Sequence, residues 1–329
     1  MKQISYSVVI RTLGTTGEKY IALLDSIAAQ TIQPEEIIVA IPEGYELDYS
    51  LGKERVVRCK KGMVSQRAAG IMAAKSDYIL VADDDLEFAP TMVEDLYNFI
   101  KEHNLNCCVP LEGENQGDGF DMTPPMAARI RQGFTGQMFV SRRRSQYLDV
   151  LTMSAGHKIY VNSNDPDKCY LCTTASFQLF FIETRLAQSA HFEEEIWLEN
   201  GTYTSYSAYD EPVFFSKLNR LGLRMAYALQ TRYTHLDAGA GHRTTNKLQE
   251  KSVRYFAIAR NRTVYWYRFI YKYQDKWYNK MRALFLGLYS LNNYTVYTII
   301  INFHPRYIKS LKYLFLGYKE AFQMIRGAE

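Results

Sequence analysis

The stretch Tyr78-Ile79-Leu80-Val81-Ala82-Asp83-Asp84-Asp85 joins a largely apolar run to three consecutive acids. A continuous apolar run is typical of a strand buried on both faces of a parallel sheet, and open α/β sheets bind their ligands beyond the carboxyl ends of such strands. Adjacent carboxylates repel one another unless a cation or hydrogen-bond donors lie between them. Carboxylate oxygens at this density favour a site for Mg²⁺ or Mn²⁺, which usually also holds substrate phosphates. The alternative is a solvated turn before a helix predicted at residues 90–103.

Strands and helices alternate around this stretch. Apolar runs and alternating patterns predict strands, and apolar residues at helical spacing predict helices. The expected strands cover residues 4–11, 36–41, 78–82, 106–110, 176–182 and 223–233, and the expected helices cover 19–30, 65–75, 90–103 and 211–221. This alternation indicates an α/β fold with a parallel sheet. A hydrophobic fraction of 47% over 329 residues is enough for one large domain with an appendage, or for two domains.

Charge is distributed unevenly along the chain. Residues 251–329 carry seven lysines and seven arginines against three acids, a net charge of +11. Because the whole chain has a net charge of +4, the first 250 residues carry −7. Twenty of those last 79 residues are also Phe, Tyr or Trp. Composition therefore predicts an acidic domain at 1–245 and a basic, aromatic, helical region at 246–329.

The cysteine content and the first residues of the chain indicate the cellular compartment in which we expect the protein. Five scattered cysteines do not form a disulfide framework. Cys169 and Cys172 make one CxxC, which without a second pair is weak evidence for zinc and fits buried thiols in a reducing cytosol better. The chain leads from Lys2 directly into a predicted strand, with no signal-peptide pattern. We therefore expect a cytoplasmic protein.

Several segments, in this order, resemble the family-2 glycosyltransferases, which are inverting enzymes. The resemblance spans roughly residues 4–262 and rests on Ser7-Val8-Val9-Ile10-Arg11-Thr12, Leu24-Asp25-Ser26-Ile27-Ala28-Ala29-Gln30-Thr31, Glu36-Ile37-Ile38-Val39, Gln66-Arg67-Ala68-Ala69-Gly70-Ile71, Asp83-Asp84-Asp85, Phe192-Glu193-Glu194 and Asp210-Glu211. No single piece is diagnostic, but their order and spacing together are specific. The resemblance implies the GT-A nucleotide-diphospho-sugar transferase fold, a Rossmann-like mixed sheet flanked by helices, with a C-terminal helical extension.

The acid triplet matches the family's DxD signature. The resemblance implies a divalent cation, Mg²⁺ or Mn²⁺, that bridges the diphosphate of the donor and stabilises the leaving group as a Lewis acid. It makes Asp85 the direct ligand, with Asp83 as a further candidate for the metal. A third ligand in such enzymes is often a histidine after the last sheet strand, and His235 fits that place, with His242 as the alternate.

The same resemblance assigns a donor side to the site. The segment that ends in Thr12 corresponds to the family's nucleotide loop, and Asp83 or Asp84 would reach the ribose or a metal-bound water. Arg67 could pair bidentately with the diphosphate, or could be a surface helix arginine. The family usually places an Asp at the end of the second strand to bind the nucleobase. Here Glu43 lies one or two positions later, so uracil, thymine and guanine nucleotides all remain open.

Inversion requires one in-line attack by an acceptor hydroxyl, whose proton a carboxylate must take as the bond forms. The family writes its acid pair as Glu-Asp, with the second acid as base, whereas this chain has Asp210-Glu211. By its position in the pair, Glu211 is the candidate for the base, and by its chemical type Asp210 is the other candidate. Alternatively, Asp210 simply caps a helix. Glu194, or the neighbouring Glu193, is a candidate for contact with a sugar hydroxyl. Trp197 is a candidate for stacking on a sugar face, and equally for core packing.

The C-terminal region has a pattern of its own. On a helical wheel, residues 251–282 place most of their lysines and arginines on one side and aromatic residues on the other. Such a helix is typical of an interfacial membrane binder, or of a helix that packs on the protein with a solvated basic face. Residues 283–305 carry no Lys, Arg, Asp or Glu, but their Ser, Asn and Thr residues disfavour insertion. We expect peripheral contact with the inner face of the plasma membrane, and no nucleic-acid binding.

The sequence thus predicts a metal-dependent transferase that moves a sugar from a nucleoside-diphosphate donor to a saccharide acceptor. A lipid-linked acceptor, as used to build bacterial surface polysaccharides, would explain the C-terminal region. One alternative is a sugar-phosphate nucleotidyltransferase, which needs basic residues in the loop after the first strand. The loop at residues 13–17 has none. The other alternative is an inactive scaffold that binds a nucleotide-sugar, which the retained acids disfavour.

Overall fold

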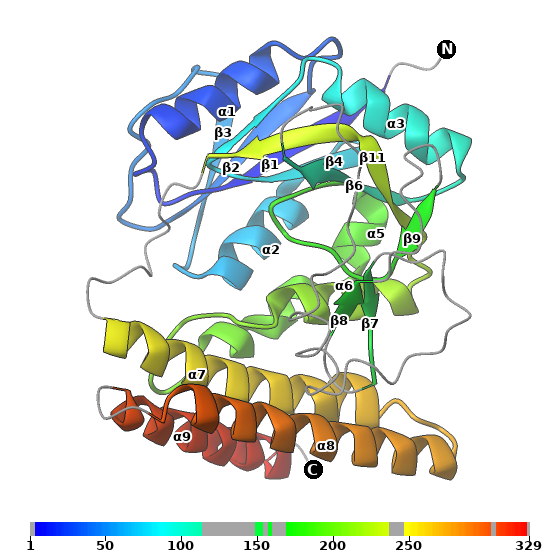
Figure 1. Cartoon of the computed structure of the whole chain (residues 1–329). Helices are drawn as coiled ribbons and strands as arrows, with labels where there is room; N and C mark the ends of the chain where they lie inside the picture. The colour runs from blue at the N-terminus through cyan, green and yellow to red at the C-terminus, as the bar shows by residue number, and fades with distance from the viewer. Residues whose placement is uncertain are drawn as a thin grey trace.

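The computed structural model describes residues 4–113, 149–153, 157–159, 169–236, 247–303 and 307–327. Its centre is a mixed sheet with the strand order β3-β2-β1-β4-β10-β6-β11-β5, in which β9 also pairs with β11 (Figure 1). The strands are β1 (Tyr6–Arg11), β2 (Glu36–Pro42), β3 (Glu54–Cys59), β4 (Tyr78–Asp83), β5 (Leu86–Phe88), β6 (Cys107–Glu112), β9 (Tyr170–Cys172), β10 (Leu179–Glu183) and β11 (Met225–His235). A second sheet pairs β7 (Asp149–Leu151) with β8 (His157–Ile159). The predicted α/β class is confirmed.

The direction of the strands places the site. β1, β2, β3 and β4 run parallel, so their carboxyl ends meet at one edge of the sheet. β10 lies antiparallel between β4 and β6, and therefore begins where β4 ends. In the register of β1 with β4, Arg11 lies opposite Asp83. The acid triplet thus lies where the first strand ends and β10 starts.

Helices cover both faces of the sheet (Figure 1). α1 (Glu18–Ala28) and α3 (Met92–Glu102) pack on one face, and α2 (Met63–Ala73) packs on the other. Neighbouring residues of β1 show the alternation, since Val8 joins the core under α1 and Val9 joins the core under α2. Beyond α2 lie α5 (Thr184–Ser189), the 3₁₀ segment η1 (Phe192–Glu199) and α6 (Asp210–Arg220).

The C-terminal helices form a further layer at the end of the molecule opposite α1 and α3 (Figure 1). They are α7 (Lys247–Tyr265), the π segment η2 (Trp266–Tyr271), α8 (Trp277–Ile301) and α9 (Ile308–Arg326). α7 is bound tightly to the layer above it. Asn261 donates from Nδ2 to the carbonyl oxygens of Leu198 and Ala208, at 2.9 and 2.8 Å. The Tyr265 hydroxyl lies 2.9 Å from Ser216 Oγ on α6.

Two expectations about elements were wrong. Residues 251–282 are not one amphipathic helix, because the chain leaves the α conformation after Tyr265 and resumes it only at Trp277. Arg262, which the wheel places on the basic side, is buried against α8. Arg260, which breaks the basic pattern, is buried against α9 and η1. The strand expected at 176–182 begins at Leu179, so residues 176–178 form a loop. Within the ranges given above, no helix is both long enough and apolar enough to cross a membrane.

Candidate active site

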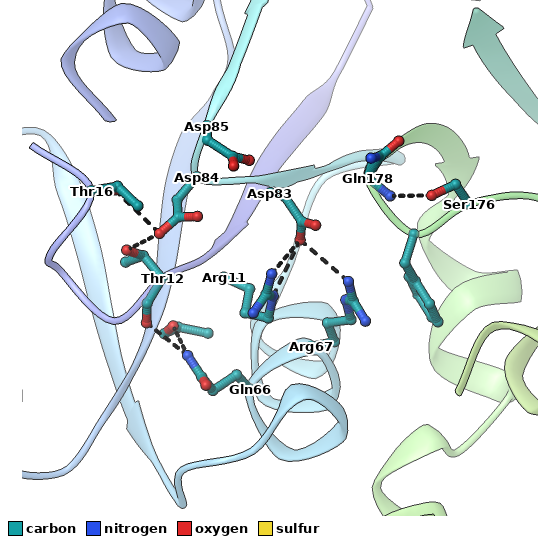
Figure 2. A network of polar contacts seen from close by, with 12 residues as sticks. Arg11, Thr12, Thr16, Gln66, Arg67, Asp83, Asp84, Asp85, Ser176 and Gln178 are labelled. Carbon is teal, nitrogen blue, oxygen red and sulfur yellow. Dashed lines mark hydrogen bonds and ion pairs between the residues drawn. The ribbon is translucent and has the colours of Figure 1, made fainter. Parts of the chain in front are cut away.

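The first aspartate of the triplet is held by two arginines from different elements (Figure 2). Asp83 Oδ1 accepts from Arg11 Nε at 3.2 Å and Nη2 at 3.0 Å, and from Arg67 Nη2 at 3.3 Å. Arg11 is the last residue of β1, and Arg67 comes from α2. Burial raises the pKa of the Asp83 carboxyl, but the two guanidinium groups outweigh it and hold the pKa below its ordinary value. Asp83 is therefore a firmly ionised group with its charge already balanced.

Arg67 connects this aspartate to the acid pair of α6. Its Nη1 donates to Asp210 Oδ2 at 2.6 Å while its Nη2 reaches Asp83, and its guanidinium lies 4.3 Å from the ring centre of Phe177. The Arg67 side chain is only 4% exposed. Burial raises the pKa of Asp210, and the arginine partly offsets this effect. One buried cation thus binds two carboxylates that lie far apart in the sequence.

The second aspartate faces the opposite way from the first, toward the loop after β1 (Figure 2). Asp84 Oδ2 accepts from the hydroxyls of Thr12 at 2.6 Å and Thr16 at 3.3 Å. Burial raises the pKa of Asp84, and the Thr12 hydroxyl and the charge of Arg11 only partly offset this effect. Thr12 is itself fixed, since Gln66 Nε2 donates to its carbonyl oxygen at 2.7 Å.

The third aspartate meets the predicted histidine. Asp85 Oδ2 lies 3.2 Å from His235 Nε2, and the Leu236 N–H donates to the Asp85 carbonyl at 2.8 Å. The antiparallel pairing of β5 with β11, in which His235 lies opposite Leu86, produces this contact. On the other side of the ring, His235 Nδ1 lies 3.5 Å from Gln178 Nε2 and 3.6 Å from a carboxylate oxygen of Glu112. No group of three or more His, Cys, Asp or Glu side chains arranged to hold a metal occurs in the described part of the chain.

The predicted acid pair begins α6. Tyr209, immediately before it, has a left-handed backbone with φ 77°, a conformation that costs a non-glycine residue on the order of 1 kcal/mol. Glu211 Oε1 accepts from the Phe177 N–H at 3.1 Å and lies 3.4 Å from Ser176 Oγ. The loop at 176–178 therefore touches Glu211 at one end and, through Gln178, His235 at the other. Gln178 also accepts from the Tyr233 hydroxyl at 2.8 Å.

Three other predicted site residues lie apart from these contacts. Glu43 follows β2 and is exposed. Glu194 is exposed on η1 and pairs with Lys217 at 3.0 Å. Trp197 is 9% exposed, and its ring lies under Arg268 at 5.5 Å, which favours a packing role. Their contacts with donor or acceptor stay predictions, and His242 lies outside the described residues.

The site contains residues that the sequence did not single out. Arg11 lies within the quoted opening segment, but only the register of β1 with β4 places it on Asp83. Gln178 and Glu112 lie 57 and 123 positions before His235, and they share no motif or charge pattern with it. Only the strand order brings these two residues close to His235. The one signal available for all three was that each is a polar residue within a predicted strand or close to the end of one.

The mixed sheet and the acids at its strand ends agree with the GT-A class of α/β fold that the sequence predicts. Residues 46–163 match the family profile described as Glycosyl transferase family 2. This profile covers 118 of the 329 residues, and over that stretch the chain is similar to glycosyltransferase family 2. No curated protein matches it in sequence.

Solved structures support the fold. A crystal structure of S. aureus TarS 1-349 shares 16% identity and a TM-score of 0.52 over 96% of this chain and 81% of that one. TarS 1-349 in complex with UDP-GlcNAc gives 14% identity and a TM-score of 0.50, over 96% of this chain and 82% of that one. A structure of GalNAc-T7 with UDP, GalNAc and Mn²⁺ gives 15% identity and a TM-score of 0.48, over 89% and 55% of the two chains. The TarS likeness confirms the predicted GT-A fold.

Proposed function

We propose that the enzyme transfers a sugar, with inversion, from a UDP-sugar to a hydroxyl of a saccharide acceptor. The observation that carries this proposal is the contact of Arg67 with both Asp83 and Asp210. It joins the carboxylates of the predicted donor side to the acid pair of the predicted acceptor side. The similar TarS structure was solved with UDP-GlcNAc, which supports a uridine nucleotide as the donor.

The donor would lie along the carboxyl ends of β1, β2 and β4. Thr12 and Asp84 offer a hydroxyl and a carboxylate that already contact each other at 2.6 Å, a suitable pair for a ribose. Glu43, exposed after β2, is the candidate for the uracil edge. Arg11, which contacts Asp83, is the proposed partner of the diphosphate, because both terminal nitrogens of Arg67 are engaged by Asp83 and Asp210.

Asp85 and His235 fit a divalent cation, Mg²⁺ or Mn²⁺. They supply one carboxylate and one imidazole nitrogen 3.2 Å apart, and such ions often take most of their remaining ligands from phosphates and water. Asp83 is a poorer ligand, because both arginines occupy the same oxygen. When bound, the cation would neutralise charge that develops on the diphosphate as it leaves. His235 Nδ1 would then carry a proton and face the Glu112 carboxylate, whose nearer oxygen lies 3.6 Å away.

Glu211 is the proposed general base. Asp210 is engaged by Arg67 at 2.6 Å, and Glu211 occupies the second position of the acid pair, where its Oε1 accepts from the Phe177 N–H at 3.1 Å. The acceptor oxygen attacks the anomeric carbon, the bond from that carbon to the diphosphate oxygen breaks, and its electron pair stays on the diphosphate. Glu211 takes the hydroxyl proton as the new bond forms. Asp210 would hold Arg67, and with it the geometry of the helix start.

Substitution of the acid pair tests the assignment of the base. Glu211→Gln keeps the shape and the contact with the Phe177 N–H, so we expect kcat to fall about 10²–10⁴-fold while donor binding is retained. Turnover is measured as UDP release, and donor binding by isothermal titration calorimetry. If Glu211→Gln turns over normally and Asp210→Asn, with an intact fold, does not, the base is Asp210. Absence of turnover in the unmodified protein with every donor and acceptor tried would favour a scaffold.

Substitution of the histidine tests the cation. We expect UDP to raise the melting temperature of the protein more with Mn²⁺ than without it, because a ligand that binds only the folded state stabilises it. In His235→Ala this metal-dependent increment should disappear, while the smaller effect of UDP alone persists. His191, which is exposed immediately before η1 and pairs with Glu193, gives the matched control His191→Ala. Equal increments in both variants would contradict the metal site.

The acceptor is proposed to be a lipid-linked saccharide, with the enzyme located at the inner face of the plasma membrane. The excess of +11 in the last 79 residues supports this location. Transfer assays with lipid-linked and with water-soluble acceptors of the same sugar would compare the two. A clear preference for the soluble acceptor would contradict the proposal.

A further inference from the structure

The last two helices expose an unusual number of large apolar side chains. Trp277 is 76% exposed and Phe285 is 64% exposed on α8, and Phe315 and Phe322 on α9 are each more than half exposed. A soluble surface rarely gathers such residues without a partner. We refer to Trp277, Met281, Phe285 and Leu288 of α8 with Phe315 and Phe322 of α9 as the α8–α9 apolar surface.

These residues are arranged by helical spacing. On α8, successive members lie three or four positions apart, which places them along one face. The opposite side of α8 is buried, as Ala283, Leu286 and Ser290 show. On α9, Phe315 and Phe322 are seven positions apart, so they also share a face. The two helices lie together at the end of the molecule (Figure 1), and the Tyr318 hydroxyl joins them to Thr295 Oγ1 at 2.9 Å.

Exposed cations flank this surface. They are Lys276, Lys280 and Arg282 on and beside α8, and Lys309, Lys312 and Lys319 on α9. The acid of α9, Glu320, is turned inward and pairs with Arg260 Nε at 2.5 Å. Lys312 and Lys319 lie on the same side of α9 as the two phenylalanines. Lys312 is three positions before Phe315, and Lys319 is four positions after Phe315 and three before Phe322. Long lysine side chains in this position can extend their ammonium groups to phosphates while the rings lie deeper.

We propose that the α8–α9 apolar surface binds an anionic lipid bilayer, lying in its interface. This proposal deepens the peripheral location proposed above, and it moves the contact from the helix expected at 251–282 to α8 and α9. A second copy of the chain is the main competitor, but two like surfaces would bring the flanking lysines and arginines of both copies together, which is unfavourable. Anionic phosphates complement them. Interfacial helices of this type combine Trp, Phe and Leu with lysines, as these two do.

The tryptophans provide a direct readout. The chain has three, and Trp197 and Trp266 are 9% and 7% exposed, against 76% for Trp277. Vesicles of phosphatidylcholine with phosphatidylglycerol should shift the emission of the full-length protein to shorter wavelength and protect it from acrylamide. Vesicles of phosphatidylcholine alone should do so far less. Trp277→Phe should abolish the shift while the protein still sediments with the anionic vesicles.

Charge and apolar contact are tested by matched variants. Met281→Glu should abolish sedimentation with anionic vesicles, whereas Met72→Glu, at a methionine of α2 that is 45% exposed, should not. Lys312→Gln and Lys319→Gln should each weaken partitioning about fivefold, and Lys53→Gln, in the loop before β3, should not change it. UDP release with a soluble acceptor should be unaffected in all of them, so a failure here is separate from a failure of the transferase proposal.

Two results would overturn the proposal. The first is equal sedimentation of Met281→Glu and Met72→Glu with anionic vesicles. The second is a dimer in analytical ultracentrifugation that Met281→Glu dissociates, together with no binding of the unmodified protein to anionic vesicles. The second result would assign the surface to another copy of the chain.

Discussion

At the scale of residues, three consecutive aspartates have three different environments. Asp83 faces two arginines, Asp84 faces two threonine hydroxyls, and Asp85 faces an imidazole. The strand ends at Asp83, and the chain then turns, so neighbouring side chains point in different directions (Figure 2). Identical residues consequently have pKa values displaced in opposite directions, lowered for Asp83 and raised for Asp84.

This difference predicts opposite effects on stability. Asp83→Asn leaves Arg11 and Arg67 without their shared counterion, and we expect a loss of about 3–5 kcal/mol in the free energy of unfolding at neutral pH. Asp84→Asn removes a poorly compensated charge from a partly buried position, so the ligand-free protein should become more stable. Chemical denaturation of the two variants beside the unmodified protein measures both effects. A destabilised Asp84→Asn would contradict this account.

The pH dependence of the two effects also differs. Asp84 has a raised pKa when folded, so its penalty exists at neutral pH and disappears as the pH falls through that raised value. Asp83 has a lowered pKa, so its stabilisation is present above the ordinary carboxyl pKa and disappears only as the pH falls through the lowered value. On acidification, the gain of Asp84→Asn should therefore vanish at a higher pH than the loss of Asp83→Asn. Simultaneous disappearance would contradict the assignment.

The sequence identified candidate site residues but gave no information about the side chains that contact them. The acids and His235 stand out by type and by position after predicted strands. Asp83 lies between two arginines because of the register of β1 with β4 and the position of α2 on the sheet. Register and packing depth are tertiary properties, which local patterns do not specify. Roles for Asp83, Arg67 and Asp210 could therefore be sorted only with the contacts in view.

At the scale of elements, α9 approaches α7 closely at a glycine. A Cβ added at Gly317 would collide with the Phe256 carbonyl oxygen and lie 3.1 Å from the Cβ of Ala259. We therefore expect Gly317→Ala to force the helices apart and to lower the free energy of unfolding by about 1–3 kcal/mol. Gly327→Ala, just after α9 where the nearest atom is 3.5 Å away, is the control. Equal stability of the two variants, measured by urea denaturation, would show that the helices can shift freely.

Elements were predictable where burial alone determines them. β1, β2 and β4 are buried along most of their length, and their apolar runs identified them. β3 is largely exposed, with the pattern Glu-Arg-Val-Val-Arg-Cys, and was not expected. The basic pattern at 251–282 failed for a related reason. Arg262, counted on the basic side of the predicted helix, is buried and donates to Ser290 of α8, and a wheel assigns exposure by charge without knowing such partners.

At the scale of the whole molecule, composition separates residues 1–245 from residues 246–329, but the hydrophobic core is shared between the two parts. Val264, Tyr265 and Ala321 of the C-terminal helices belong to the same core cluster as Phe180 of β10 and Phe214 of α6. We therefore expect the sheet and the C-terminal helices to unfold in one cooperative transition. Differential scanning calorimetry should give equal calorimetric and van't Hoff enthalpies.

A variant at the junction of the layers sharpens this prediction. Asn261→Ala leaves the Leu198 and Ala208 carbonyls without their donor and should lower the stability of the entire transition by about 1–3 kcal/mol. Thr263, buried elsewhere on α7 with its hydroxyl donating to the Ala259 carbonyl of the same helix, gives the control Thr263→Val, which should shift the transition much less. Two separate transitions, of which only one moves, would instead support independent units at 1–245 and 246–329.

The guanidinium of Arg67 has a consequence for how this enzyme can be altered. Arg67 binds one carboxylate on the proposed nucleotide side and another next to the proposed base, so a change at either carboxylate alters how Arg67 contacts the other. Substitutions at Asp83 and Asp210 should accordingly be non-additive, with a coupling energy of about 0.5–3 kcal/mol in a double-mutant cycle. Re-engineering the preference for one substrate would thereby disturb the handling of its co-substrate, so the two specificities would have to be evolved together.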